Sequence, residues 1–265
     1  MDLRIDGNVA LVTASSGGLG FAAARALVRE GVNVVVNGRS EESLETAADD
    51  LRAEAADGAS VLPVAVDLTD PDGPPRLVQA SVAEFGRLDH LVTSAGGPPS
   101  GAFLDIDEEE WYDTYDLLVM SVVRTVREAA PHLRADGGGT IVTIASRTVK
   151  QAAEAMVLSN AVRMGVVGLE KTLSTELAPE VRANAVLPGS HETERVENLI
   201  EQAVDRGDFD TYDEGYADRV SEVPLERLGT TGEFGAAVAF LSSPRSGFVN
   251  GAAVPIDGGS LASNL

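Results

Sequence analysis

Residues 9–20 constrain the fold of this chain more than any other stretch. They read Val-Ala-Leu-Val-Thr-Ala-Ser-Ser-Gly-Gly-Leu-Gly and run directly into an amphipathic segment at 21–30. This order predicts a buried strand, a tight glycine turn and a helix. The unpaired N–H groups at the start of such a helix attract an anion, and the glycines let a pyrophosphate approach the backbone. Glycines also form ordinary surface turns, so the flanking strand and helix are what indicate a nucleotide site.

Apolar runs and amphipathic segments alternate along the rest of the chain. Further strands are expected at 33–37, 60–66, 90–93, 140–144, 182–187 and 253–256. Further helices are expected at 41–55 (N-cap Ser40), 70–85 (Pro71 near its first turn), 108–133, 153–177 and 233–241. The alternation predicts an α/β fold, a Rossmann-type doubly wound parallel sheet between two helical layers. One dinucleotide-binding domain over 1–265 is expected, with the acidic segment 190–228 as a helical excursion that forms the substrate loop.

The charge balance narrows the classes of partner. The chain carries 42 acidic and 20 basic residues, a net charge of −22, so we expect neither nucleic acid nor membrane as a partner. Its 44% hydrophobic content argues for a folded chain rather than a disordered one. An acidic surface with few lysines resembles proteins of salt-loving archaea, in which high ionic strength screens the self-repulsion.

Several other features are expected to be absent. The chain has no cysteine, which excludes disulfides and a thiolate nucleophile. No apolar run reaches membrane-spanning length and no signal pattern opens the chain, so a cytoplasmic location is expected. The histidines (His90, His132 and His191) fall at unrelated spacings, so no metal site is expected.

Six motifs resemble those of the short-chain dehydrogenase/reductase family. Residues 13–20 are similar to its Thr-Gly-x-x-x-Gly-x-Gly cofactor turn, with Ala14 at the first glycine. Residues 85–96 resemble the lead into its Asn-Asn-Ala-Gly motif, 141–146 the strand that delivers a catalytic serine, and 182–189 the strand ending in Pro-Gly. Residues 224–229 and 257–259 resemble its closing signatures. The resemblance, strongest to the 3-oxoacyl-(acyl-carrier-protein) reductase branch, implies an NAD(P)-dependent oxidoreductase acting on a carbonyl or hydroxyl group of a small molecule.

The catalytic residues of that family are mostly replaced. Its carbonyl reductases use an Asn-Ser-Tyr-Lys set, in which tyrosine supplies the proton and lysine holds the ribose. Alignment retains Ser146, puts Ser159 and Arg163 at the tyrosine and lysine positions, and puts about Leu118 at the asparagine position. A serine hydroxyl is a far weaker acid than a phenol, and a guanidinium donates hydrogen bonds but cannot relay a proton. Two interpretations stay open: a working site built on Ser146, Ser159 and Arg163, or a degenerate protein that acts as a nucleotide-binding or assembly module.

Other side chains are candidates for the missing acid. Lys150 follows Ser146 by four residues, and His191 follows the Pro-Gly pair. Each is also interpreted as an ordinary loop residue. Tyr112 and Tyr115 lie one helix away and are expected to be packing residues.

NADP is the expected cofactor, with NAD as the second choice. Enzymes that prefer NAD place an acid at the end of the second strand to hold the ribose 2′-hydroxyl. Here that end reads Asn37-Gly-Arg-Ser, and Arg39 with Ser40 could bind a 2′-phosphate, although Arg39 could also be a surface residue. The expected cofactor residues are Thr13, Ser15, Ser16, Gly18, Leu19, Gly20, Asn37, Arg39, Ser40, Asp67, Leu68, Ala95, Gly96, Arg163, Pro188, Gly189 and Thr193.

The resemblance also implies an oligomer. The long helices at 108–133 and 153–177 would pair with symmetry mates in a homodimer or homotetramer. Their apolar stripes could equally be core of the single chain.

Overall fold

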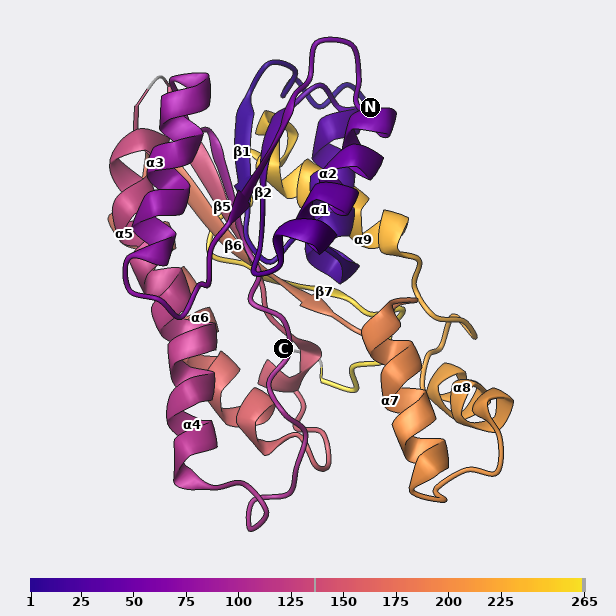
Figure 1. Cartoon of the computed structure of the whole chain (residues 1–265). Helices are drawn as coiled ribbons and strands as arrows, with labels where there is room; N and C mark the ends of the chain where they lie inside the picture. Colours follow the sequence, from indigo (N-terminus) through magenta and orange to yellow (C-terminus); the bar gives the residue numbers. More distant parts are fainter. Residues whose placement is uncertain (136, 264–265) are drawn as a thin grey trace.

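A sheet of seven parallel strands forms the centre of the computed structural model, which describes residues 1–135 and 137–263 (Figure 1). The strands lie in the order β3-β2-β1-β4-β5-β6-β7. Their bounds are β1 (Val9–Val12), β2 (Asn33–Gly38), β3 (Val61–Ala65), β4 (His90–Thr93), β5 (Gly139–Ile144), β6 (Val181–Pro188) and β7 (Ala253–Ile256). The order reverses between β1 and β4, which confirms the predicted doubly wound parallel sheet.

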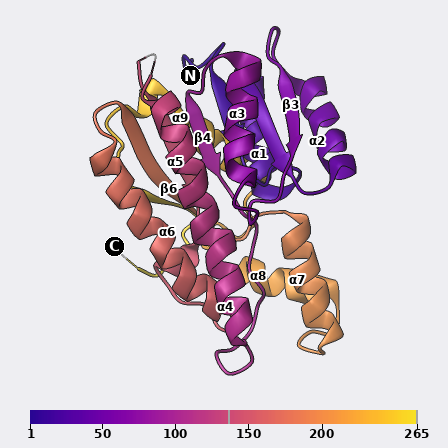
Figure 2. The ribbon, with the colours of Figure 1, turned by 60° about the vertical axis from the view of Figure 1, so that its left-hand side comes forward.

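Helices cover both faces of the sheet, as parallel strands require. One face carries α1 (Gly18–Arg29), α2 (Glu41–Glu54) and α9 (Thr231–Ser242), and the other carries α3 (Gly73–Phe85), α5 (Ser121–Leu133) and α6 (Val157–Glu176). Figure 2 shows α3, α5 and α6 lying side by side in front of the sheet. In β1, Ala10 and Val12 face the first layer whereas Val9 and Leu11 face the second, so alternate residues build two separate cores.

Two helices begin later than the sequence predicts. α3 begins at Gly73 rather than at 70, because Asp70 and Pro71 lie in a preceding turn and Pro74 occupies the start of the helix. α6 begins at Val157 rather than at 153. The side chain of Asn160 bonds both backbone groups of Ala153, at 3.1 and 2.8 Å, and holds the preceding residues in a loop.

The helix predicted at 108–133 contains a π-helical turn. α4 (Glu108–Tyr115) leads into this turn, η1 (Asp116–Met120), and α5 follows it. The wider turn places Leu118 and Val119 against Val162 and Val166 of α6 in a small apolar cluster. The helix–helix contact is therefore made by apolar side chains at the position where the resemblance implies an asparagine.

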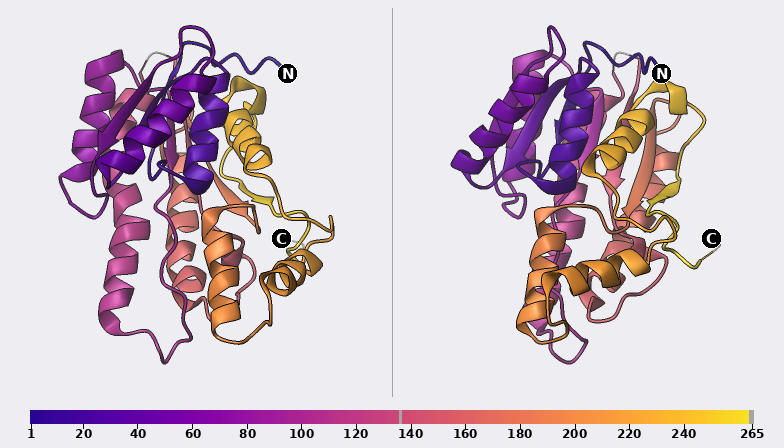
Figure 3. Two further views of the ribbon diagram at one scale, coloured as in Figure 1. Left: turned by 45° about the vertical axis from the view of Figure 1, so that its right-hand side comes forward. Right: turned by 90° about the vertical axis from the view of Figure 1, so that its right-hand side faces the viewer.

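The acidic segment 190–228 contains α7 (Glu194–Asp205) and α8 (Tyr212–Ser221). Both helices lie beyond the carboxyl ends of the strands (Figure 3). Thr193 and Thr211 cap them by accepting hydrogen bonds from backbone N–H groups. Within the described residues, no helix has the length and apolarity needed to span a membrane.

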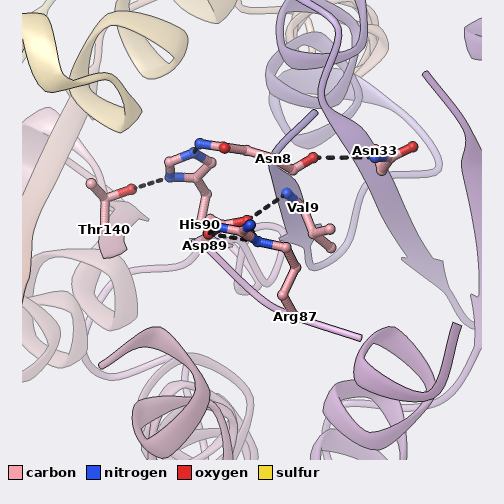
Figure 4. A network of polar contacts seen from close by, with 7 residues as sticks. All are labelled: Asn8, Val9, Asn33, Arg87, Asp89, His90 and Thr140. Atoms are coloured by element: carbon pink, nitrogen blue, oxygen red, sulfur yellow. Dashed lines mark hydrogen bonds and ion pairs between the residues drawn. The ribbon is translucent and has the colours of Figure 1, made fainter. Parts of the chain in front are cut away.

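A polar network joins β1 to β4 at the amino ends of the strands (Figure 4). The Asp89 carboxylate accepts a hydrogen bond from Val9 N at 2.8 Å and forms an ion pair with Arg87. Asn8 Nδ2 lies 2.9 Å from His90 Nε2, so Nδ1 carries the ring proton and donates it to Thr140 Oγ1 at 2.9 Å. Burial lowers the pKa of His90 to about 4, so the network holds a neutral imidazole.

This network predicts a loss of stability in mild acid. An unfolded histidine has its ordinary pKa of about 6.5, so between about pH 6.5 and 4 the unfolded state binds more protons than the folded state. The contribution of His90 to the free energy of unfolding should therefore decrease by up to ~1.4 kcal/mol for each unit that the pH is lowered over this window. We expect His90→Gln to flatten this slope in urea unfolding curves, whereas the control His132→Gln should leave it unchanged. An unchanged slope in His90→Gln would contradict the account.

Candidate functional site

The candidate residues gather at the rim, by which we mean the turns that follow the carboxyl ends of β1 to β6. These turns are residues 13–20, 39–40, 66–69, 94–100, 145–150 and 189–193. Because the strand order reverses between β1 and β4, the first and fourth turns are neighbours. Thr13 Oγ1 donates to Ser94 O at 2.6 Å and accepts from Ser94 N at 2.8 Å. Open α/β sheets bind their ligands at this point of reversal.

The glycine turn leaves a helix N-terminus open to an anion. α1 begins at Gly18, no side chain caps it, and its first turn carries no acidic residue. Around Gly17 and Gly18 nothing lies within 4 Å of an added Cβ, so ligand can approach the backbone. At Gly20 a Cβ would lie 2.4 Å from Ala14 O, so only glycine lets the helix pack on the turn. The free N–H groups and the helix dipole fit a pyrophosphate here.

Ala14 adopts a left-handed backbone conformation, with φ at 45°. An alanine in this region is strained by roughly 1 kcal/mol, part of which glycine would relieve. We expect Ala14→Gly to raise the free energy of unfolding by ~0.5 kcal/mol and to tighten NADPH binding a few-fold, since a methyl group leaves the turn. Urea unfolding and NADPH fluorescence titration measure the two effects, and weaker binding in the variant would contradict the expectation.

Asn37 and Ser15 hold the rim turns together. Asn37 Oδ1 accepts from Ala14 N at 3.1 Å, and its Nδ2 donates to Val64 O at 3.2 Å and Val66 O at 3.1 Å. Ser15 Oγ accepts from Asn37 N at 2.9 Å. Both residues are buried. These bonds position the cofactor turn, and direct contact between the two side chains and a cofactor stays a prediction.

The end of β2 presents a cation rather than an acid. Arg39 and Ser40 are exposed there, and Ser40 Oγ caps α2 by accepting from Ser43 N at 3.4 Å. Asp67, beyond β3, accepts hydrogen bonds from Thr69 N and Oγ1, and these bonds with the charge of Arg39 lower its pKa. The guanidinium of Arg39 would contact a ribose phosphate bound at this edge. Of the other expected cofactor residues, Pro188 ends β6. The rest lie in the same rim turns: Ser16, Leu19, Leu68, Ala95, Gly189 and Thr193.

Three hydroxyl-bearing side chains, those of Ser146, Thr148 and Ser159, lie together where the catalytic residues are expected. Ser146 Oγ accepts a hydrogen bond from Thr148 N at 3.2 Å, which leaves its own O–H free to donate. Ser159 is buried, and its Oγ lies 3.0 Å from Thr148 Oγ1. The structure thus brings Ser146 and Ser159 to one place through Thr148, a residue that the sequence analysis missed.

Arg163 is buried and points at the rim from α6. Its Nη2 donates to Gly96 O at 2.7 Å and its Nη1 donates to Ala145 O at 3.2 Å, while its Nε has no partner among the described residues. Burial and the nearby charge of Arg195 lower its pKa to about 10, so it stays protonated at neutral pH. Arg163 thus joins the turns after β4 and β5 and carries a desolvated positive charge beside Ser146.

The other candidate acids lie in different surroundings. Tyr112 and Tyr115 are 68% and 50% exposed on α4, so the expectation that they are packing residues is wrong for the single chain. His191 is buried edge-on against Phe234 and bonds Gly189 O through Nδ1, and burial lowers its pKa. Lys150 ends the short helical turn after Ser146 and is partly exposed. Of these candidates, Lys150 best combines nearness to Ser146 with solvent access.

A buried acid lies beneath the rim and was missed in the sequence. Glu170 of α6 is 2% exposed; its Oε2 accepts from Thr143 Oγ1 at 2.7 Å, while Thr93 Oγ1 donates to Thr143 Oγ1 at 2.9 Å. Its Oε1 has no partner among the described residues. Burial raises the pKa of Glu170 to about 8. An acidic residue on the apolar stripe of the predicted helix was the signal that could have revealed it.

A cleft of about 670 Å³ opens beside the rim, between residues 97–100 and α7. Arg195 of α7 lines it and donates to Pro98 O at 3.1 Å. Its guanidinium packs on Gly97, where a Cβ would lie 2.5 Å from Cζ. Metal-binding groups of three or more His, Asp or Glu side chains do not occur in the part of the chain that the structure describes, and the expectation of no metal stays a prediction.

Comparisons with known proteins agree with this architecture. A family model described as enoyl-(acyl carrier protein) reductase matches residues 13–260. Tropinone reductase-like 3 of Erythroxylum coca is 33% identical over 97% of this chain and 94% of its own length. The 3-oxoacyl-(acyl-carrier-protein) reductase of Thermotoga maritima is 30% identical, covering 97% and 99%. The structure of L-sorbose reductase of Gluconobacter frateurii, complexed with NADPH and L-sorbose, superposes with a TM-score of 0.94 at 31% identity and covers 99% of this chain and 100% of that one.

Proposed function

The chain belongs to the short-chain dehydrogenase/reductase family, and from this premise we propose that it is an NADP-dependent oxidoreductase with a non-standard catalytic set. Its substrates are small molecules with a carbonyl or hydroxyl group. The observation that carries the proposal is the rim itself: an uncapped helix N-terminus, an exposed arginine after β2 and a free serine hydroxyl after β5 follow one another along one edge of the sheet.

The residues present fit a dinucleotide. The first turn of α1 would hold the pyrophosphate, Arg39 and Ser40 the 2′-phosphate, and Thr193 with Gly189 the nicotinamide end. When bound, the dihydronicotinamide supplies the hydride. Gly96 lies in the turn that Arg163 fixes from below, so α6 positions the nicotinamide side of the site.

Ser146 and Arg163 both act on the carbonyl oxygen of the substrate. Ser146 Oγ–H donates to the substrate carbonyl oxygen, and Thr148 N fixes the orientation of that hydroxyl. The buried charge of Arg163 stabilises the negative charge that develops on the same oxygen. Ser159 supports Thr148 through their shared hydroxyl contact. Lys150 is the proposed source of the proton, because it follows Ser146 by four residues and reaches solvent.

The second candidate function is a catalytically degenerate, nucleotide-binding or assembly module. It is favoured by the apolar packing of Leu118 and by the burial of Ser159 where the resemblance implies an asparagine and a tyrosine. NADPH fluorescence titration in molar KCl, followed by NADPH oxidation with a panel of aldehydes and ketones, separates the two. Turnover supports the enzyme, binding without turnover supports the module, and no binding of either cofactor contradicts both nucleotide-based functions.

The proposal also covers the salt environment of the protein, its oligomeric state and its substrate loop. The net charge of −22 supports a cytoplasm of high salt, as in halophilic archaea, where screening allows such a surface. Exposed Tyr112, Tyr115 and Met164 on α4 and α6 support pairing of these helices in a homodimer or homotetramer. The α7–α8 segment, 190–228, is the proposed substrate loop of the single domain 1–265, because it borders the cleft beside the rim.

A further inference from the structure

The cleft beside the rim differs in charge from the rest of this acidic protein. Its lining includes Arg195 of α7 and Arg206 at the C-terminal end of that helix, with Ser100, Asn198 and Gln202 as neutral hydrogen-bonding groups and Glu194 as an acid. Arg206 forms an ion pair with Asp208 at 2.9 Å. Within the described residues no carboxylate lies within 4.0 Å of Arg195, whereas most arginines of this chain have such a partner. Within the described residues, Arg195 thus has no carboxylate partner, although the chain has about twice as many acidic as basic residues.

Arg195 is also held in a defined place. Its guanidinium donates one hydrogen bond to Pro98 O and packs on Gly97, while Arg163 bonds Gly96 O from the other side of the same loop. The two guanidinium groups are close enough for the charge of Arg195 to lower the pKa of Arg163. Two neighbouring positive charges make this side of the rim a place where an anion is stabilised.

We propose that the substrate carries a carboxylate and that Arg195 binds it in this cleft while the substrate carbonyl reaches Ser146. This rests on the proposed function. The reaction is the reduction of an oxo acid to a hydroxy acid: the carbonyl carbon gains a hydride, the oxygen gains a proton, the dihydronicotinamide is oxidised, and the carboxylate is unchanged. Arg195 has N–H groups left for a two-pronged bond to a carboxylate after donating to Pro98. A phosphate dianion fits less well, since Glu194 lies in the cleft lining and the other described arginine of that lining, Arg206, is already paired with Asp208.

The test compares acids with their neutral esters. NADPH oxidation is measured with 2-oxo, 3-oxo and 4-oxo acids and their methyl esters, using wild type, Arg195→Gln, Arg195→Lys and Arg127→Gln. Arg127 is an exposed arginine on α5 and serves as the matched control. We expect wild type to favour at least one acid over its ester by about tenfold or more in kcat/KM, the worth of a charged hydrogen-bonded pair. Arg195→Gln should remove this preference through KM, Arg195→Lys should keep part of it, and Arg127→Gln should leave it unchanged.

The proposal is overturned if acids and esters react equally in wild type, or if Arg195→Gln slows both to the same extent. Calorimetric titration of the same oxo acids into the protein with NADP⁺ keeps the carboxylate site testable without turnover. Binding that Arg195→Gln abolishes supports the site even if no NADPH is oxidised, in which case only the proposed function fails. No binding of any oxo acid to wild type overturns the carboxylate site.

Discussion

Arg163→Ala is expected to weaken NADPH binding by more than tenfold and to lower the free energy of unfolding by about 3 kcal/mol. The guanidinium donates to Gly96 O and Ala145 O, which lie in the turns after β4 and β5. The second of these turns has a further link to α6 through Thr148 and Ser159. Removing it takes a hydrogen bond from the carbonyl of the buried residue Ala145 and frees the turn of Gly96, which we propose lines the nicotinamide side. NADPH fluorescence titration and urea unfolding measure the two losses.

The matched variants separate position from charge. Arg163→Lys keeps a cation that can reach one of the carbonyl groups, so it should retain NADPH binding within a few-fold of wild type. Lys171→Ala removes an exposed cation from the same helix and should change neither quantity by much. An Arg163→Ala protein that binds NADPH as tightly as wild type would remove Arg163 from the cofactor site.

Glu170→Gln is expected to stabilise the protein, and to do so more strongly as pH rises. The pKa of Glu170 is raised to about 8 by burial, whereas an unfolded glutamate titrates near 4.5. Between these values the folded state holds a proton on Glu170 that the unfolded state has released, so the contribution of Glu170 to stability decreases as pH rises toward 8. Glutamine cannot ionise and can still accept the hydrogen bond from Thr143. The gain should grow by up to ~1.4 kcal/mol per pH unit and reach several kcal/mol near pH 8.

Urea unfolding of wild type and Glu170→Gln from pH 4.5 to 8.5 measures this effect. Glu176→Gln removes an exposed carboxylate from the same helix and is the control, for which no comparable pH-dependent gain is expected. Equal stability of Glu170→Gln and wild type at pH 8 would mean that Glu170 is not buried in its neutral form.

Local patterns in the sequence predicted most of the backbone. The strands at 90–93 and 253–256 lie at the predicted residues, because continuous apolar runs bounded by turns leave little freedom in where a buried parallel strand begins. The start of α6 could not be predicted, since it depends on the side chain of Asn160 bonding Ala153. The start of α3 was misplaced because Pro74, rather than Pro71, occupies the first turn.

In the candidate site, local pattern likewise predicts where residues lie, whereas tertiary contacts decide what their side chains bond. The rim positions of Ser146, Arg163 and the glycine turn follow from the ends of strands and from helical spacing. The hydrogen bonds of their side chains do not follow from local pattern, because they depend on tertiary contacts. Arg163 finds its partners in the turns after β4 and β5, and Asn37 finds one on the neighbouring strand β3. Arg195 resembles any surface arginine in sequence, and only the packing of α7 against Gly97 brings it to the cleft.

The central claim is that this rim reduces a carbonyl group with Ser146 as the donor to its oxygen. Steady-state NADPH oxidation by wild type and Ser146→Ala, in molar KCl with the oxo acids and ketones named above, tests it most directly. The account predicts turnover by wild type and a fall in kcat of about a hundredfold or more in Ser146→Ala at unchanged NADPH affinity, the usual effect of losing one donor to a developing oxyanion. Equal turnover by the two proteins, or NADPH binding by wild type with no oxidation of NADPH by any substrate, would contradict it.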